Sequence, residues 1–308
     1  MNKNPTSIET CKTRAIFTKN ARTAWAKIIS SASGQEKKKI LLPSYIGYTD
    51  REGSGVFDPI QSSASDFVFY KLKEDLSPDL EDLQQKMNSD IDIVLIIHYF
   101  GFCRTNLKFI RKLCNDNDAV MVEDCAHAFY LSTNPLELGE VGDYSFYSIH
   151  KYLATQTGGL LKVNNGQLSI PEIHGHEAAT ASVVEAYALA NFEQIAEIRR
   201  INYRIFFEQL QDIQEIEILF ELQNHEIPQT FPIKVANNLR EKLYFYLMDR
   251  KLETTALYYR LITEISEQEY PTSHSISKSI LNLPIHQDIS MDQVDSMCAE
   301  IKKFFKTH

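Results

Sequence analysis

Short apolar runs alternate with helix-like stretches along the first half of the chain, and their length is typical of buried strands. Between several of these runs, the apolar residues have the spacing of a helix. One such helix is predicted at residues 77–88, with Ser77 as the cap and Pro78 in the first turn, and another at residues 106–115. This order is typical of a mostly parallel sheet between helices, so we predict an α/β fold. The predicted strands are residues 39–42, 66–70, 91–98, 119–123, 144–148 and 159–163.

The pattern changes near residue 178. From there to residue 210 the apolar positions have helical spacing, which predicts one long helix with a stripe formed by Ala186, Leu189, Phe192, Ile195 and Ile198. Beyond it we predict strands at residues 216–219 and 229–235 and helices at residues 239–250 and 291–305. We therefore divide the chain into a large α/β domain (residues 1–177) and a connecting helix with a small C-terminal α+β domain (residues 178–308).

Composition narrows the class of protein. With 308 residues, 44% of them hydrophobic, the chain can bury a large core. A net charge of -9 without a basic stripe argues against nucleic acid as a ligand. No run is long enough to span a membrane, and residues 1–6 lack the apolar stretch of a signal peptide, so we expect a cytoplasmic protein. Reduced thiols are expected for the five cysteines, which show no C-x-x-C spacing: Cys11, Cys103, Cys114, Cys125 and Cys298.

The candidate chemistry lies where predicted strands end. Asp124 closes one apolar run, and Ser145 and Lys151 lie on and just after a later one, before the pair Gly158 and Gly159. The ends of strands are where open α/β sheets bind ligands. A lysine amine, a buried carboxylate and a hydroxyl are the groups needed to hold and use pyridoxal phosphate. The sequence therefore predicts an enzyme that uses this cofactor.

The same residues resemble a known family. Glu123-Asp124-Cys125-Ala126-His127, Ser145-Phe146-x-x-x-x-Lys151 and Gly158-Gly159, in this order, are similar to the DegT/DnrJ/EryC1/StrS sugar aminotransferases, which are fold-type I pyridoxal phosphate enzymes. Further pieces of similarity extend the resemblance over nearly the whole chain: Phe17–Ala24 resembles the phosphate-binding turn, Ile96–Gly101 a strand ending in glycine, and Leu281–His286 the segment Leu-Pro-x-His.

The resemblance implies roles for the central residues. Lys151 would bind the cofactor covalently and then move the proton between substrate and cofactor. Asp124 would pair with the pyridine nitrogen through a charge-assisted bond. His127, at a position where the family more often has glutamine, would contact the ring or its oxygen. We expect His150, beside Lys151, to be structural, because alternation at a strand end would point it elsewhere.

The resemblance also implies a phosphate site and a stacking residue. Ser145 would hold the phosphate together with Arg22 and Thr23, the latter two through backbone amides at a helix start. Tyr45 or Tyr48 would supply the aromatic face that stacks on the ring. In function, the resemblance implies a homodimer that transfers an amino group from an amino acid such as glutamate to a keto sugar, linked to a nucleotide, for a polysaccharide or a secondary metabolite.

Two alternatives come from other classes of protein. The segment between Gly159 and the helix near Ala178 is short, with no counterpart of a Gly-x-Asn stretch that reaches the partner's cofactor in the family. A repurposed relative that keeps the fold and binds a ligand or partner is therefore the rival hypothesis. Tyr147-x-x-x-Lys151 also imitates short-chain dehydrogenases, but these need a glycine-rich turn after the first strand. The first glycine here is Gly34, and no such turn is present.

Overall fold

The computed structural model describes residues 14–32, 37–128 and 138–307, and Cys11 lies outside this part of the chain. Within it, the large sheet has seven strands in the order β1-β7-β6-β5-β4-β2-β3. All run parallel except β7, which is antiparallel to both of its neighbours. The strands are β1 (Ala15–Thr18), β2 (Lys39–Pro43), β3 (Asp66–Tyr70), β4 (Ile93–Ile97), β5 (Val120–Cys125), β6 (Tyr144–Ser148) and β7 (Gly159–Val163).

Helices cover both faces of this sheet, as its apolar strands predict. On one face, α1 (Ala21–Ser31) packs Trp25 against Phe146 of β6, with the two rings stacked. On the other face, α5 (Ala181–Leu189) packs Tyr187 against Phe17 of β1. The remaining helices of this lobe are α2 (Phe57–Ser62), α3 (Leu80–Lys86) and α4 (Leu107–Asp116). The prediction of an α/β fold with a mostly parallel sheet between helices is confirmed.

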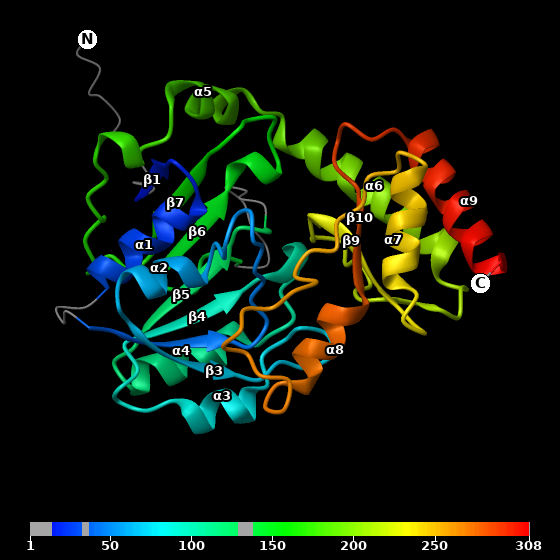
Figure 1. Cartoon of the computed structure of the whole chain (residues 1–308). Coiled ribbons are helices and arrows are strands. Elements are labelled where there is room, and N and C mark those ends of the chain that lie inside the picture. The colour runs from blue at the N-terminus through cyan, green and yellow to red at the C-terminus, as the bar shows by residue number, and fades with distance from the viewer. Residues whose placement is uncertain (1–13, 33–36, 129–137, 308) are drawn as a thin grey trace, which may run out of the picture.

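A second, smaller lobe lies beside the first (Figure 1). Among the described residues, its sheet has three antiparallel strands in the order β10-β9-β8. They are β8 (Ile216–Ile218), β9 (Thr230–Val235) and β10 (Ile280–Pro284), packed with α6 (Phe192–Leu210), α7 (Arg240–Asp249) and α9 (Met291–Thr307). The chain returns to the large sheet before β10: Ser273 of α8 (Pro271–Ser279) hydrogen-bonds to Ser44 after β2.

Two predicted helices are wrong in detail. The single long helix from residue 178 is two helices, because the chain turns extended at Ala190 and Asn191 caps a new helix. The predicted stripe therefore does not form, and Leu189 is exposed. Asp79, not Ser77, caps α3, since its carboxylate accepts the first free amides of the helix.

The domain boundary at residue 178 stays a prediction. The helix that follows it, α5, still packs on the large sheet, whereas α6 carries the chain to the small one. In the described part of the chain, none of the helices has the length and apolar character needed to cross a bilayer.

Candidate active site

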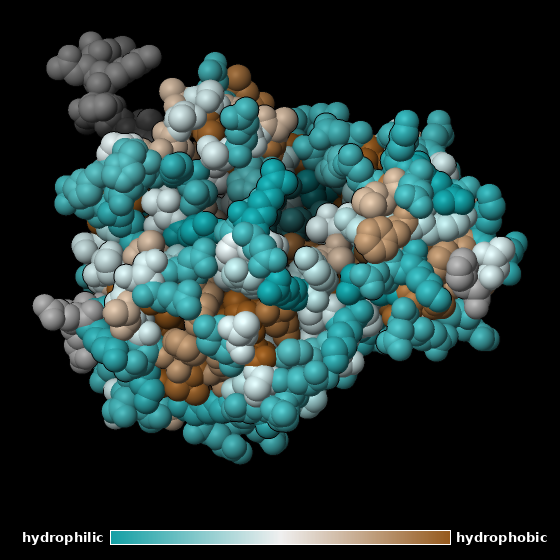
Figure 2. Space-filling model, in the orientation of Figure 1, coloured by the Kyte–Doolittle hydropathy of each residue, from teal (hydrophilic) through white to brown (hydrophobic). Residues whose placement is uncertain are grey.

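The main cavity of the described structure opens at the carboxyl ends of the parallel strands, where open α/β sheets bind ligands. Its volume is about 1040 Å³. The ends of β5 and β6, the start of α1 and residues 47–49 and 51–56 form one side, while α7 and residues 254–259 form the other. A hollow between the two lobes is visible on the surface, bordered by hydrophilic side chains (Figure 2). The cavity therefore combines residues that lie far apart in the sequence.

Asp124 reaches the cavity from the end of β5. It is 4% exposed, and its Oδ1 accepts a hydrogen bond from the backbone amide of Ala126 at 2.8 Å. Burial raises the pKa of Asp124 from 3.8 to about 6, although the Ala126 amide and Lys151 oppose this shift. A carboxylate in such a position is well suited to pair with a cationic ring nitrogen, because it is hardly solvated by water.

Lys151 faces the same cavity from η2 (Ile149–Lys151), the short turn after β6. Burial lowers the pKa of its amine from 10.5 to about 8, against the attraction of Asp124. Part of the lysine population is thus uncharged near neutral pH and can act as a nucleophile or a base. The backbone of Lys151 is held from behind by Arg199, which donates to its carbonyl at 3.1 Å.

His127 lines the cavity together with Asp124. Its ring stacks on Phe100, with the planes 8° apart, and lies 5.8 Å from the ring of Tyr258. Burial, and next the charge of Lys151, hold the pKa of His127 well below 6.5, so its imidazole is neutral. The residue therefore presents an uncharged polar ring to the cavity.

The start of α1 lines the cavity. Asn20 caps the helix and accepts the amide of Thr23 at 2.8 Å, so this amide is already used, and Thr23 does not line the cavity. Ala21 and Arg22 do line it, and their first-turn amides have no carbonyl within the helix to bind. Of the two predicted phosphate contacts in α1, Arg22 lines the cavity and Thr23 does not, so Ala21 becomes the candidate in place of Thr23.

Gly159 allows this helix start to approach the sheet. A Cβ atom at Gly159 would lie 2.4 Å from the carbonyl carbon of Asn20 and 2.6 Å from the nitrogen of Ala21. The preceding residue, Gly158, has φ of +135°, a conformation that favours glycine. The glycine pair of the sequence motif is therefore a backbone contact between β7 and α1.

Two predicted site residues point away from the cavity. Alternation along β6 sends Phe146 and Ser148 to the cavity and Ser145 to the opposite face, where its hydroxyl lies 3.4 Å from the Tyr147 hydroxyl. Ser148 therefore replaces Ser145 as the candidate hydroxyl. Tyr45 is fully buried against Tyr99 and Tyr258 and does not line the cavity.

The candidates for ring stacking change accordingly. Tyr48 lines the cavity, as the alternative prediction requires, and so does Tyr258, which the sequence did not indicate. Tyr258 has φ of +61°, an uncommon conformation for an aromatic residue, and its ring lies directly against Gly47. A Cβ atom at position 47 would collide with that ring at 1.7 Å. Gly47 was therefore the sequence signal that could have indicated the contact with Tyr258.

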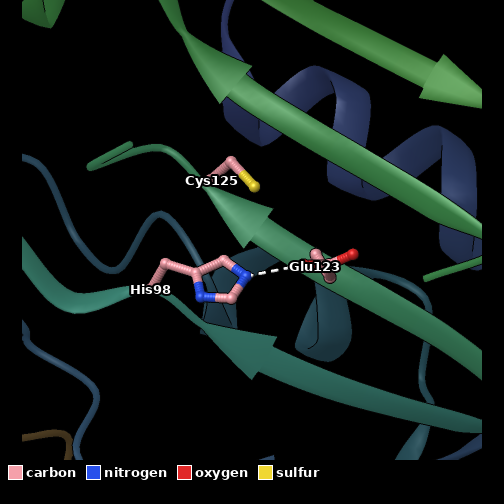
Figure 3. Close-up of side chains that lie close together, drawn as sticks. All are labelled: His98, Glu123 and Cys125. Atoms are coloured by element: carbon pink, nitrogen blue, oxygen red, sulfur yellow. Dashed lines mark hydrogen bonds and ion pairs between the residues drawn. The ribbon is translucent and has the colours of Figure 1, made fainter. Parts of the chain in front are cut away.

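Glu123, the neighbour of Asp124, points to the opposite side of β5, toward His98 (Figure 3). One carboxylate oxygen accepts from the His98 ring at 2.7 Å and from the Gly139 amide, and the other accepts from the amides of Val141 and Gly142. Cys125 lies close enough to complete a possible metal-ligand set with His98 and Glu123. Because Glu123 already accepts four hydrogen bonds, we assign this cluster to structure: it fixes the loop after residue 138 beneath β5.

The fold and the site define a class of protein before any comparison. A lysine and a buried aspartate that share a cavity at the strand ends of this sheet, with a helix start at one end, are the parts of a fold-type I pyridoxal phosphate enzyme. Solved structures agree on the fold. The aminotransferase TlmJ from Streptoalloteichus hindustanus has a TM-score of 0.80 at 18% identity, covering 96% of this chain and 86% of that one. Spr1654 from Streptococcus pneumoniae, in its pyridoxamine phosphate form, has a TM-score of 0.81 at 12% identity, covering 95% and 88%.

The family follows from the sequence comparison. The model of the DegT/DnrJ/EryC1/StrS aminotransferase family matches residues 54–173 and 177–302. A GDP-perosamine synthase from Vibrio cholerae is 25% identical over 273 residues, which are 77% of this chain and 73% of that protein. The chain belongs to the DegT/DnrJ/EryC1/StrS aminotransferase family and is a pyridoxal phosphate-dependent transaminase.

Proposed function

We propose that this aminotransferase binds pyridoxal phosphate in the cavity and transfers an amino group from an amino acid, such as glutamate, to a keto sugar linked to a nucleotide. The observation that carries the proposal is the pair Asp124 and Lys151, which face one cavity with pKa values of about 6 and about 8. Both shifts come from burial, and buried titratable pairs of this kind are typical of catalytic sites.

The residues of the chain have distinct tasks in this proposal. When bound, the cofactor supplies an electron-accepting ring next to the reacting amine. Asp124 would hold the protonated ring nitrogen, and Lys151 would take and return a proton at its Nζ. His127 would contact the ring or its oxygen. Ala21, Arg22 and Ser148 would hold the phosphate.

The substrate class rests on relatives and on the family. The Vibrio cholerae relative is a GDP-perosamine synthase, so a nucleotide-linked keto sugar is the acceptor to test first. The cavity, at about 1040 Å³, exceeds the usual range for small-molecule pockets and leaves room for a cofactor and a substrate together. We further propose, from the resemblance, a cytoplasmic homodimer with its active sites near the subunit interface; light scattering tests the dimer.

The test of the chemistry is covalent trapping. Purified protein is mixed with pyridoxal phosphate, reduced with borohydride and mapped by peptide mass. We expect a visible absorption band and a label on Lys151, both lost in Lys151→Ala. The matched control is Lys112→Ala, an exposed lysine of α4 paired with Asp116, which should keep both signals. Absence of a band in the wild type would favour the rival hypothesis of a repurposed binding protein.

A panel of keto sugars with several amino donors then tests the substrate. We expect turnover to require the nucleotide and to show ping-pong kinetics, since the amine is loaded in one half-reaction and delivered in the other. Bound cofactor without turnover of any donor would refute the transaminase role of this site.

A further inference from the structure

His150 lines the cavity, whereas the sequence predicted that its side chain would point elsewhere. It precedes Lys151 in η2 and lines the main cavity together with Ser148. The Ser148 hydroxyl lies 3.3 Å from Nδ1 of His150. Both side chains are therefore available on the cavity wall within one turn of the chain.

This wall is joined directly to the start of α1. The amide of Ile149 donates to the Gly158 carbonyl at 2.9 Å, and the amide of Gly158 donates to the Lys19 carbonyl at 2.8 Å. Two backbone hydrogen bonds thus connect the turn that carries His150 to the residue just before the helix cap, Asn20. His150 and the first residues of α1 consequently line the same cavity and are joined by this backbone path.

The surroundings of His150 lower the pKa of its imidazole, so the free residue is mostly neutral at pH 7. Burial and the charge of Lys151 lower its pKa, while the Gly158 carbonyl and the Glu52 carboxylate act in the opposite direction. Arg22, a basic residue in the first turn of α1, is engaged elsewhere: its guanidinium donates to the Glu52 carbonyl at 2.8 Å and lies 3.7 Å from Asp58. An incoming phosphate would therefore find the His150 imidazole, rather than the Arg22 guanidinium, beside the helix start.

We propose that His150 is a further ligand of the cofactor's phosphate, donating a hydrogen bond from its imidazole beside the Ser148 hydroxyl and the α1 amides. This inference rests on the proposed binding of pyridoxal phosphate in the cavity. A phosphate monoester is mostly dianionic above pH 6.5, since its second pKa is about 6. A dianion raises the pKa of a neighbouring imidazole, so binding takes up a proton at His150. The phosphate contribution to affinity then declines as pH rises through the bound-state pKa of His150.

The test compares two ligands that differ only in the phosphate. Pyridoxamine phosphate and pyridoxamine lack the aldehyde, so neither forms a covalent bond with Lys151. We expect His150→Gln to bind pyridoxamine phosphate about tenfold more weakly, the loss typical of a charge-assisted hydrogen bond, and pyridoxamine within twofold of wild type. The control is His225→Gln, an exposed histidine outside the cavity, which should bind both ligands as the wild type does.

A pH series gives the second measurement. The pKa of Lys151, about 8, lies between pH 6.5 and 9, but Lys151, Asp124 and Glu52 are present in both proteins, so the ratio of wild-type to His150→Gln affinity isolates His150. We expect this ratio to fall as pH rises, and the phosphorus resonance of the bound ligand to show a titration that the variant lacks.

The outcomes separate the two hypotheses. Equal losses for the two ligands, or no loss for either, would overturn the role of His150 and leave the proposed function intact. A wild-type protein that binds pyridoxamine phosphate no better than pyridoxamine would overturn phosphate binding itself, and with it the proposed function.

Discussion

Replacing Asp124 by asparagine should stabilise the cofactor-free protein at neutral pH while removing its ability to pair with a ring nitrogen. The wild-type carboxylate is ionised at pH 7 in a site where it is 4% exposed. Asparagine has nearly the same shape and can still accept the Ala126 amide through its oxygen. The substitution therefore removes a poorly solvated charge without opening a cavity.

The magnitude follows from the pKa of Asp124. Its value rises from 3.8 to about 6 on folding, a difference of about 2 in pKa, which corresponds to about 3 kcal/mol. Because the folded pKa lies above the unfolded one, the folded state binds more protons between these values. The contribution of Asp124 to the free energy of unfolding should thus fall by about 3 kcal/mol as pH rises from about 4 to about 6, and then stay level. The asparagine variant should lack this fall.

The assay is urea unfolding of cofactor-free protein at pH 4.5, 6 and 8. Asp143→Asn is the matched control, because Asp143 is also buried but accepts from Arg111 and from the Met121 amide. Losing this ion pair should destabilise the protein by roughly 3 kcal/mol. If Asp124→Asn were as destabilising at pH 8 as Asp143→Asn, or if its difference from the wild type did not grow with pH, the assignment of Asp124 as an unfavourably buried charge would be refuted.

Two further substitutions test the residues that hold the site in place. Gly159→Ala places a Cβ atom against the backbone at the start of α1, so it should lower the free energy of unfolding by roughly 1 to 3 kcal/mol and weaken the binding of pyridoxamine phosphate. Gly166→Ala, which has open space around it, is the control and should be neutral in both assays. Arg199→Lys should lower the free energy of unfolding in urea by roughly 3 kcal/mol. Lysine keeps the charge, but it loses the guanidinium hydrogen bonds to the carbonyls of Lys151 and Gln229 and the stacking on Tyr152. An unchanged unfolding midpoint would show that the guanidinium geometry is irrelevant.

Much of the large sheet could be predicted because its signal is local. The apolar runs of β3, β6 and β7 coincide with the observed strands, since each is fully specified by its own residues. The break between α5 and α6 could not be predicted in this way. Helical periodicity continues across it, and only the capping by Asn191 and the different surfaces beneath the two helices divide the segment.

The same distinction, between local signals and long-range packing, applies to the residues of the candidate site. Asp124 and Lys151 could be placed at strand ends, where the cavity lies, because their distance from the apolar runs is a local property; their catalytic roles stay a prediction. Ser145 and Ser148 could not be told apart, because the choice between them depends on which face of β6 meets the cavity. Tyr258 was missed altogether, since it reaches the site from the small lobe, and its approach is set by packing against Gly47 rather than by a pattern in its own segment.

The adjacent acids Glu123 and Asp124 show why the motif needs two carboxylates with opposite properties. Burial alone would raise both pKa values. On one face of β5, His98 and backbone amides outweigh burial and lower the pKa of Glu123, so this charge is matched and fixes the fold. On the other face, the Ala126 amide and the charge of Lys151 lower the pKa of Asp124 less than burial raises it, so its pKa rises. The charge on Asp124 is left largely unmatched in this structure, and in the proposed function a cationic ring nitrogen would match it. We infer that alternation along β5 gives Glu123 a structural role and Asp124 a role in cofactor binding. What would abolish the site is an exchange of the groups that surround the two carboxylates, not an exchange of the two acidic residues themselves.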